Sequence, residues 1–213
     1  MRLKYIAREF NEKNIAIVGS SSNLLGKCYG KKIDAADTVI RINFNINHIE
    51  NIVDYGSKCD VRFVGATLEY KNHEHLIELL KKPTYLSRIY TRQVNMPYLK
   101  DFKNIEFISD SFHELVYRKF INLHNEVNIQ DIYIPRSGCA FLIFIYLYSK
   151  AKSISVYGFS MSKKDNYKYY DTSRQLSISD YDKSWINKCH GNIDEEIKIL
   201  RYLKSKRRIS IYV

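Results

Sequence analysis

Glycine, three serines and an asparagine directly follow a short apolar segment near the start of the chain. The segment Ile15–Val18 has the composition of a buried strand, and the polar run Gly19–Asn23 comes straight after it. Backbone N–H groups and small hydroxyls in such a loop suit a bound anion or a ribose. The run contains neither a GxGxxG sequence nor a glycine–lysine–serine/threonine sequence, so it is neither a dinucleotide fingerprint nor a P-loop.

Three further groups of residues that could do chemistry lie later in the chain. The segment Pro135–Gly138 opens an apolar stretch, and Tyr169–Asp171 lies in a polar one. His190 precedes Glu195 near the C-terminus. Serine and glycine at a helix start favour anions, and a histidine can accept a proton near neutral pH. Each group also has a plain structural interpretation, as a turn, a helix cap or loop aromatics packed on the core.

Short strand-like segments alternate with helix-like segments, which predicts an α/β fold with a mainly parallel sheet flanked by helices. We expect one Rossmann-like domain over residues 1–213, because this length with 45% hydrophobic residues suffices for one core. The predicted strands are Ile15–Val18, Thr38–Ile42, Val61–Val64, Tyr85–Tyr90, Ile105–Ile108, Ile154–Tyr157 and Ile209–Val213. The predicted helices are Asn72–Lys82, Phe112–Asn122, Cys139–Lys150 and Ile193–Lys204.

Polar or glycine-containing segments follow three of the predicted strands. Gly19–Asn23 follows the first strand, Asn43 the second, and Gly158–Phe159 the sixth. Ligands of an open parallel sheet collect beyond the carboxyl ends of its strands, so these residues are expected to line one ligand pocket. The stretch Lys163–Ser184 has no hydrophobic periodicity, which is typical of a functional lid or a disordered loop. Because it ends shortly before His190, we expect a lid over a site.

The formal net charge of +11 indicates anionic partners: nucleic acid, an acidic membrane surface, or phosphorylated and carboxylated small molecules. The basic residues are spread along the chain, apart from the cluster Lys204–Arg208. A nucleic-acid-binding protein would use this charge directly, with stacking from some of the 18 tyrosines. That alternative leaves the ordered polar motifs unexplained, and no nucleic-acid partner is expected.

The sequence gives little indication of disulfide bonds, of a metal site or of a membrane-spanning segment. The four cysteines show no CxxC pairing, which fits a reducing compartment. No cysteine or acidic cluster completes a metal site around His73 and His75, so no metal is expected. The longest apolar stretch, Cys139–Tyr148, is about half the length that spans a bilayer. No signal peptide is visible at the N-terminus, and we expect a cytoplasmic protein.

Taken together and in order, these segments resemble the motifs of the sialyltransferases of glycosyltransferase family 29. Ile15–Leu24, Tyr29–Asp34 and Arg41–Asn43 look like the large sialylmotif, and Pro135–Phe159 looks like the small one. The third motif is similar to Tyr169–Tyr170–Asp171, and the very small one to His190 with Glu195. The resemblance runs from Ile15 to the C-terminus, with no recognisable signal between Asn45 and Ile134.

The resemblance implies an inverting, metal-independent transferase on a variant of the GT-A fold, with a CMP-activated sugar acid as donor substrate and no cofactor. It implies that Asn23 and Asn43 contact the phosphate and ribose of CMP. Ser137 and Gly138 would hold the phosphate or the sugar carboxylate, and His190 would be the general base. Side chains would offset the charge on departing CMP in place of a metal. The side chains available to stabilise this charge are those of Arg136, Lys168, Tyr169 and Tyr170. The implied donor-binding site is completed by Gly19, Ser20, Gly158 and Phe159. Glu195 is given a structural or supporting role.

The chain departs from the family pattern at two positions of the implied site. The family usually has asparagine at the position of Ser20 and histidine at that of Lys168. Lysine can meet a phosphate as a point charge, but it does not relay a proton at neutral pH. These differences leave the donor open between CMP-sialic acid, which the resemblance favours, and CMP-Kdo. A CMP-sugar-binding module without activity is a further alternative, which the presence of His190 disfavours.

The implied acceptor is a surface glycan such as lipooligosaccharide or capsule. The basic cluster Lys204–Arg208 would suit peripheral contact with an anionic inner membrane. This contact is a prediction from charge alone.

Overall fold

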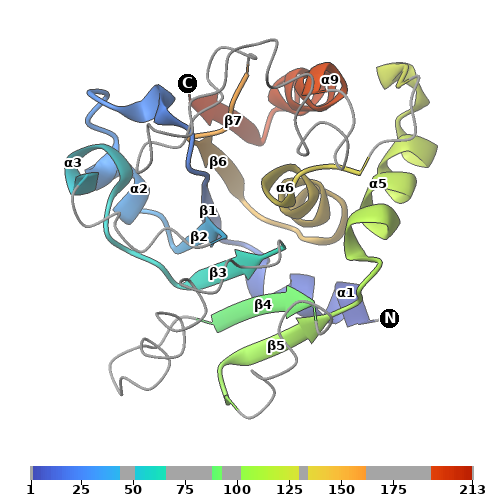
Figure 1. The fold of residues 1–213 in the computed structure, drawn as a ribbon, viewed down its shortest axis with the longest axis horizontal. Coiled ribbons are helices and arrows are strands. Elements are labelled where there is room, and N and C mark those ends of the chain that lie inside the picture. The colour runs from blue at the N-terminus through green and yellow to red at the C-terminus, as the bar shows by residue number, and fades with distance from the viewer. Residues whose placement is uncertain are drawn as a thin grey trace, which may run out of the picture.

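The computed structural model describes residues 2–43, 51–65, 88–92, 102–129, 134–161 and 193–212. Its centre is one seven-stranded sheet in the order β5-β4-β3-β2-β1-β6-β7 (Figure 1). All six neighbouring pairs are parallel. The strands are β1 Asn14–Val18, β2 Thr38–Ile42, β3 Val61–Val64, β4 Arg88–Arg92, β5 Ile105–Ile108, β6 Ser153–Tyr157 and β7 Ile209–Tyr212.

Helices cover both faces of the sheet, and alternate residues of β1 show how. Ile15 and Ile17 belong to the larger core, with residues of α1, α5, α6 and α9. Ala16 and Val18 belong to a smaller core on the other face, with Ile33 of α2 and Tyr55 of α3. Successive strand side chains point to opposite faces, so a strand covered on both faces is mostly apolar. This is why β1 contains the apolar run Ile15–Val18, whereas β2 and β3 each carry one buried arginine, Arg41 and Arg62.

The helices have the bounds α1 Arg2–Ala7, α2 Gly30–Asp34, α3 Ile52–Tyr55, α5 Phe112–Leu123, α6 Ser137–Tyr148 and α9 Ile193–Lys204. Helix α6 is the most deeply placed of these, with every side chain from Cys139 to Ile145 buried. A helix that is apolar on all sides is a core helix. It packs beside α5 in the larger core (Figure 1).

The predicted α/β fold is confirmed, and all seven predicted strands are present. Strand β4 is described over Arg88–Arg92, two residues beyond the predicted end at Tyr90, and residues 85–87 lie outside the described residues. Helix α6 begins at Ser137, two residues before the predicted start, and ends at Tyr148. The predicted helix Asn72–Lys82 also lies outside the described residues. Helices α1, α2 and α3 were missed because four to six residues carry too little periodicity to be recognised.

Candidate functional site

The strand order creates a topological switch point between β1 and β6. From β1 the chain adds β2 to β5 on one side of the sheet, and β6 and β7 then join the other side. The crevice beyond the carboxyl ends of the strands at such a point is where open parallel sheets bind ligands. Gly19 follows β1 and Gly158 follows β6, so both predicted glycines lie at this crevice.

Gly19 and Gly158 bring the two loops into backbone contact. The Gly19 N–H donates to the carbonyl of Tyr157 at 2.8 Å, and the Ser21 N–H donates to that of Gly158 at 2.9 Å. A Cβ atom on Gly19 would lie 2.4 Å from the Gly158 carbonyl oxygen, and Gly158 has a φ of +64°. No side chain fits at the first position, and the second has the left-handed conformation that glycine adopts without strain. Ser20, in the same loop, is partly exposed.

Asn23 links the same two loops through its side chain. Its Nδ2 group donates to the carbonyl oxygen of Phe159 at 2.8 Å. A carbonyl oxygen only accepts, so this contact fixes which end of the amide is the nitrogen. The Asn23 Oδ1 atom is buried and has no hydrogen-bond partner among the described residues. A buried acceptor of this kind calls for a donor such as a ribose hydroxyl, whereas a phosphate oxygen cannot supply one.

Asn43 directly follows β2 and is held there by contacts with β3 and with Gly65, the residue after β3. Its N–H donates to Phe63 O at 2.7 Å, and its carbonyl accepts from Arg62 Nη1 at 2.7 Å. The side-chain Oδ1 accepts from the Gly65 N–H at 3.2 Å. These contacts hold a φ of +57°, which asparagine tolerates better than most residues. With Oδ1 so engaged, the Nδ2 group is the end of the amide that can donate to a phosphate or hydroxyl oxygen.

Ser137 and His113 meet at Gly65, directly after β3. A Cβ atom on Gly65 would lie 2.3 Å from Ser137 Oγ and 3.0 Å from His113 Cε1. The Ser137 hydroxyl therefore sits over the backbone of Gly65, where β3, α5 and α6 come together. Sequence analysis did not assign Gly65 or His113 to the site. The position of Gly65 directly after a predicted strand could have indicated its role. A single histidine on a helix, such as His113, carries no comparable indication.

The start of α6 faces the loop that follows β6. A Cβ atom on Gly138 would lie 2.8 Å from the Phe159 ring, so these two predicted residues pack together. The capping residue Arg136 makes no side-chain hydrogen bond to the helix. Because α6 begins at Ser137, this serine is the first residue of the helix, and Arg136 is the residue at the capping position. Backbone N–H groups at such a start carry partial positive charge and favour an anion.

The guanidinium of Arg136 is engaged by Glu196 at the start of α9. Arg136 Nη2 and Nε lie 2.6 and 3.0 Å from Glu196 Oε1, and the Arg136 N–H donates to Oε2 at 3.3 Å. The Glu196 carboxylate is buried, with 3% of its side chain exposed. This ion pair joins segments 60 residues apart and positions the start of α6. A role for Arg136 in donor binding stays a prediction.

Glu195 lies beside Glu196 and is also buried. Its Oε1 accepts from Lys198 Nζ at 2.8 Å, one turn along α9. Its Oε2 is buried without a hydrogen-bond partner among the described residues. The supporting role predicted for Glu195 remains untested, because His190, five positions earlier, lies outside the described residues. Lys168, Tyr169 and Tyr170, and the predicted lid Lys163–Ser184, lie outside them as well.

The described residues bear on two further kinds of chemistry, metal binding and catalysis by a cysteine thiol. Across those parts, no three His, Cys, Asp or Glu side chains are grouped so that they could hold a metal ion. Metal independence itself stays a prediction. Burial raises the pKa of the Cys139 thiol, and the nearby Glu196 raises it further, so this thiol remains protonated and a poor nucleophile.

Two basic side chains of the cluster Lys204–Arg208 interact with other groups of the protein. The Lys206 ammonium lies 3.8 Å from the centre of the Tyr202 ring. The Arg208 guanidinium donates to the carbonyls of Ser149 and Tyr146. None of the helices in the described segments has the length and apolar character to cross a membrane. Peripheral membrane contact stays a prediction.

Comparison with known proteins gives one family match. The family model of Glycosyltransferase family 29 (sialyltransferase) matches residues 7–208. No curated protein sequence matches the chain.

Solved structures of sialyltransferases share the fold. A mammalian sialyltransferase in complex with Gal-beta-1-3GalNAc-ortho-nitrophenol aligns with a TM-score of 0.65 at 17% identity, covering 99% of this chain and 77% of that one. A variant of the sialyltransferase CST-II in complex with CMP aligns at 0.55 and 19% identity, covering 94% and 80%. The apo alpha-2,3-sialyltransferase from Campylobacter jejuni aligns at 0.52 and 17% identity, covering 94% and 74%.

Proposed function

The chain belongs to glycosyltransferase family 29, the sialyltransferases, and on that premise we propose that it transfers a sialic acid from CMP-sialic acid to a glycan hydroxyl. The observation that carries the proposal is the set of polar groups at the β1–β6 switch point. Asn23 presents a buried acceptor and Asn43 presents an amide donor. Helix α6 begins with Ser137 beside Gly65 after β3, and its Gly138 packs on Phe159 after β6. A nucleoside monophosphate needs all three kinds of group: an acceptor for ribose hydroxyls, donors for oxygens, and N–H groups for the phosphate.

The proposed reaction is a single displacement at the anomeric carbon of the sugar acid. His190 removes the proton from the acceptor hydroxyl as its oxygen bonds to the anomeric carbon. The bond from that carbon to the phosphate oxygen breaks, and CMP departs with the electron pair. The N–H groups at the start of α6 stabilise the developing negative charge. Attack opposite to the departing CMP inverts the anomeric configuration.

Calorimetric titration with CMP and with CDP, each with and without a chelator, tests the nucleotide site first. We expect CMP to bind more tightly than CDP, with no effect of the chelator. A site that binds CMP is then tested with CMP-sialic acid and CMP-Kdo as donors; turnover of the first and not the second supports the proposal. Absence of CMP binding would remove its basis.

Asn43→Gly is expected to weaken CMP binding by about tenfold, because one hydrogen bond to a charged group is lost. Glycine keeps the left-handed backbone conformation that Asn43 adopts at φ +57°, so the loop geometry is retained. Asn128→Gly is the matched control, since Asn128 is an exposed asparagine at φ +50° outside the site. Equal CMP affinities for the two variants would exclude Asn43 from the donor site.

Gly19→Ala is expected to lower the free energy of unfolding by about 1–3 kcal/mol and to weaken CMP binding by about tenfold. The added methyl group would push the β1 loop away from the Gly158 carbonyl, 2.4 Å from the ideal Cβ position. Gly26→Ala serves as the comparison, because a Cβ there meets nothing within 4 Å although φ is +75°. Gly26→Ala should therefore reduce stability alone. Chemical denaturation and CMP titration of both variants separate the two effects, and unaltered CMP binding by Gly19→Ala would contradict the expectation.

A further inference from the structure

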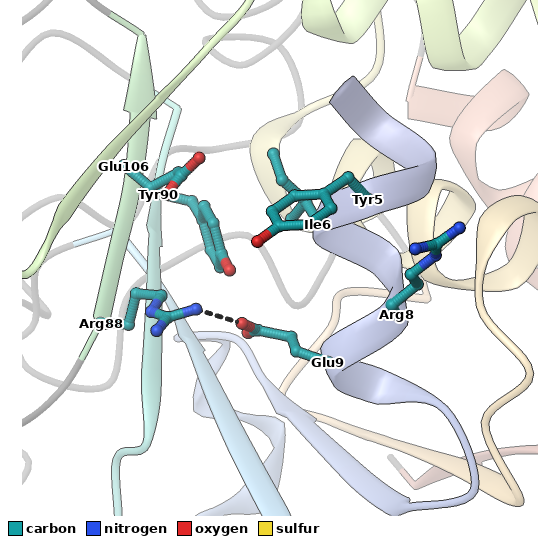
Figure 2. Close-up of a pocket in the computed structure, with 7 residues that line it drawn as sticks. All are labelled: Tyr5, Ile6, Arg8, Glu9, Arg88, Tyr90 and Glu106. Atoms are coloured by element: carbon teal, nitrogen blue, oxygen red, sulfur yellow. Dashed lines mark hydrogen bonds and ion pairs between the residues drawn. The ribbon is translucent and has the colours of Figure 1, made fainter. Parts of the chain in front are cut away.

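A pocket of about 320 Å³ lies between the N-terminal helix and the edge of the sheet, away from the switch point (Figure 2). Tyr5 on α1 and Glu9 in the turn after it form one wall. Arg88 and Tyr90 of β4 form the other, with Glu106 of β5 beside them. Arg88 is the first residue of its strand and Glu106 the second, so the pocket lies toward the amino ends of these strands. The donor site is at the opposite, carboxyl edge.

The base of the pocket is a polar group made of Arg88, Glu9 and Tyr90, in which Tyr90 is buried and the Arg88 side chain is more than half exposed. Arg88 Nη1 and Glu9 Oε2 form an ion pair at 2.7 Å, drawn as a dashed line in Figure 2. The buried Tyr90 hydroxyl lies beside both partners. Burial raises the pKa of the Tyr90 hydroxyl, so it stays protonated; it accepts from the Arg88 guanidinium and donates to the Glu9 carboxylate.

An exposed aromatic ring stands opposite this base. The Tyr5 side chain is 71% exposed although it faces Tyr90 across the pocket (Figure 2). Exposed large aromatics next to a hollow are typical of binding surfaces, because their flat apolar faces pack on a ligand at low entropic cost.

The charges of the lining decide which ligand fits. Among the residues that the structure describes, the lining includes two arginines, Arg8 and Arg88, and two glutamates, Glu9 and Glu106, so the formal charges of these residues cancel. A phosphate would meet the carboxylates of Glu9 and Glu106, and an amine would meet the guanidinium of Arg88, and each like-charge contact costs affinity. The Arg8 side chain is directed away from these groups (Figure 2). Sugar hydroxyls donate and accept, as does this mixture of groups, and the C–H face of a sugar ring suits the Tyr5 ring.

We propose that this pocket binds a neutral sugar ring, free or within a glycan chain. The pocket volume lies at the small end of the range for ligand sites, which suits one or two sugar units. The site is separate from the donor nucleotide site and does not depend on the transfer reaction. In an enzyme that modifies glycans, it would hold a neutral unit remote from the reacting hydroxyl.

Ligand-observed NMR titration of the full chain tests the proposal, with methyl β-galactoside, methyl N-acetyl-β-glucosaminide and lactose as neutral probes. Inorganic phosphate and spermidine are the charged probes. We expect binding of at least one neutral probe, no binding of the charged probes in this pocket, and no displacement by CMP. Tighter binding of lactose than of the monosaccharide would identify a glycan chain as the ligand, and equal binding a single ring.

Tyr5→Ala is expected to weaken sugar binding about threefold, and Arg88→Gln about tenfold. Tyr5 is exposed, so its replacement leaves the fold intact even if Arg88→Gln does not. Leu123→Ala, at an exposed apolar residue of α5, and Arg118→Gln, in an exposed ion pair with Glu114, are the matched controls. CMP affinity should stay unchanged in all four variants, which separates this pocket from the donor site. Absence of sugar binding, or equal binding by Tyr5→Ala and the controls, would overturn the proposal.

Discussion

Replacing His190 with alanine is expected to slow sugar transfer by about a hundredfold to ten-thousandfold while leaving CMP affinity unchanged. The acceptor hydroxyl must lose its proton as its oxygen bonds to the anomeric carbon, and alanine cannot accept a proton. In the proposed mechanism CMP occupies the donor site and His190 acts on the acceptor hydroxyl, so CMP binding should not depend on the base. Transfer rates at saturating donor, together with CMP titration of the same variant, measure the two quantities separately.

His124→Ala is the matched control for this experiment. His124 follows the C-terminal end of α5, where it contacts the Tyr202 hydroxyl at 2.8 Å. It lies about 16 Å along the helix from His113, which borders the site. His124→Ala should transfer sugar at close to the normal rate. Turnover of His190→Ala at a similar rate would show that another group is the base.

Glu196→Gln is expected to lower the free energy of unfolding by about 3–5 kcal/mol, which makes it the largest stability effect that we predict. Glu196 accepts from the side chain and the backbone of Arg136 in a buried position. Removing its negative charge takes away the carboxylate that the Arg136 guanidinium contacts at 2.6 Å, in a pair where 3% of the Glu196 side chain and 25% of the Arg136 side chain are exposed. Urea denaturation of both proteins gives the difference in the free energy of unfolding.

Glu114→Gln provides the comparison for Glu196→Gln, because it removes an exposed ion pair with Arg118 one turn along α5. Such pairs contribute about 0.3–0.5 kcal/mol. The double variant Arg136→Met with Glu196→Leu should be much more stable than Glu196→Gln alone, since neither charge is then left buried without its partner. If Glu196→Gln cost no more than Glu114→Gln, burial would not determine the strength of the Arg136 pair.

The strands could be predicted because each is determined by its own residues. A parallel strand covered on both faces is mostly apolar, so β1, β2 and β3 stand out as short runs rich in Ile and Val, although β2 contains Arg41 and β3 contains Arg62. The polar residues after them, Gly19–Asn23 and Asn43, could be assigned to one edge because all strand ends of a parallel sheet meet there. The order of the strands could not be predicted, because apolar runs of similar composition do not specify their neighbours.

The amino-acid sequence by itself determined the α/β class, the seven strands, and the placement of glycines and asparagines directly after strands, since each depends on local composition and on motif order. Only the tertiary structure decided which distant groups meet: Arg136 with Glu196, Gly65 with Ser137, and α1 with β4 around the pocket that Tyr5 and Arg88 line. The physical reason is that periodicity and propensity act over a few neighbouring residues. The partner of a buried charge or the wall of a pocket depends instead on how elements remote in sequence pack.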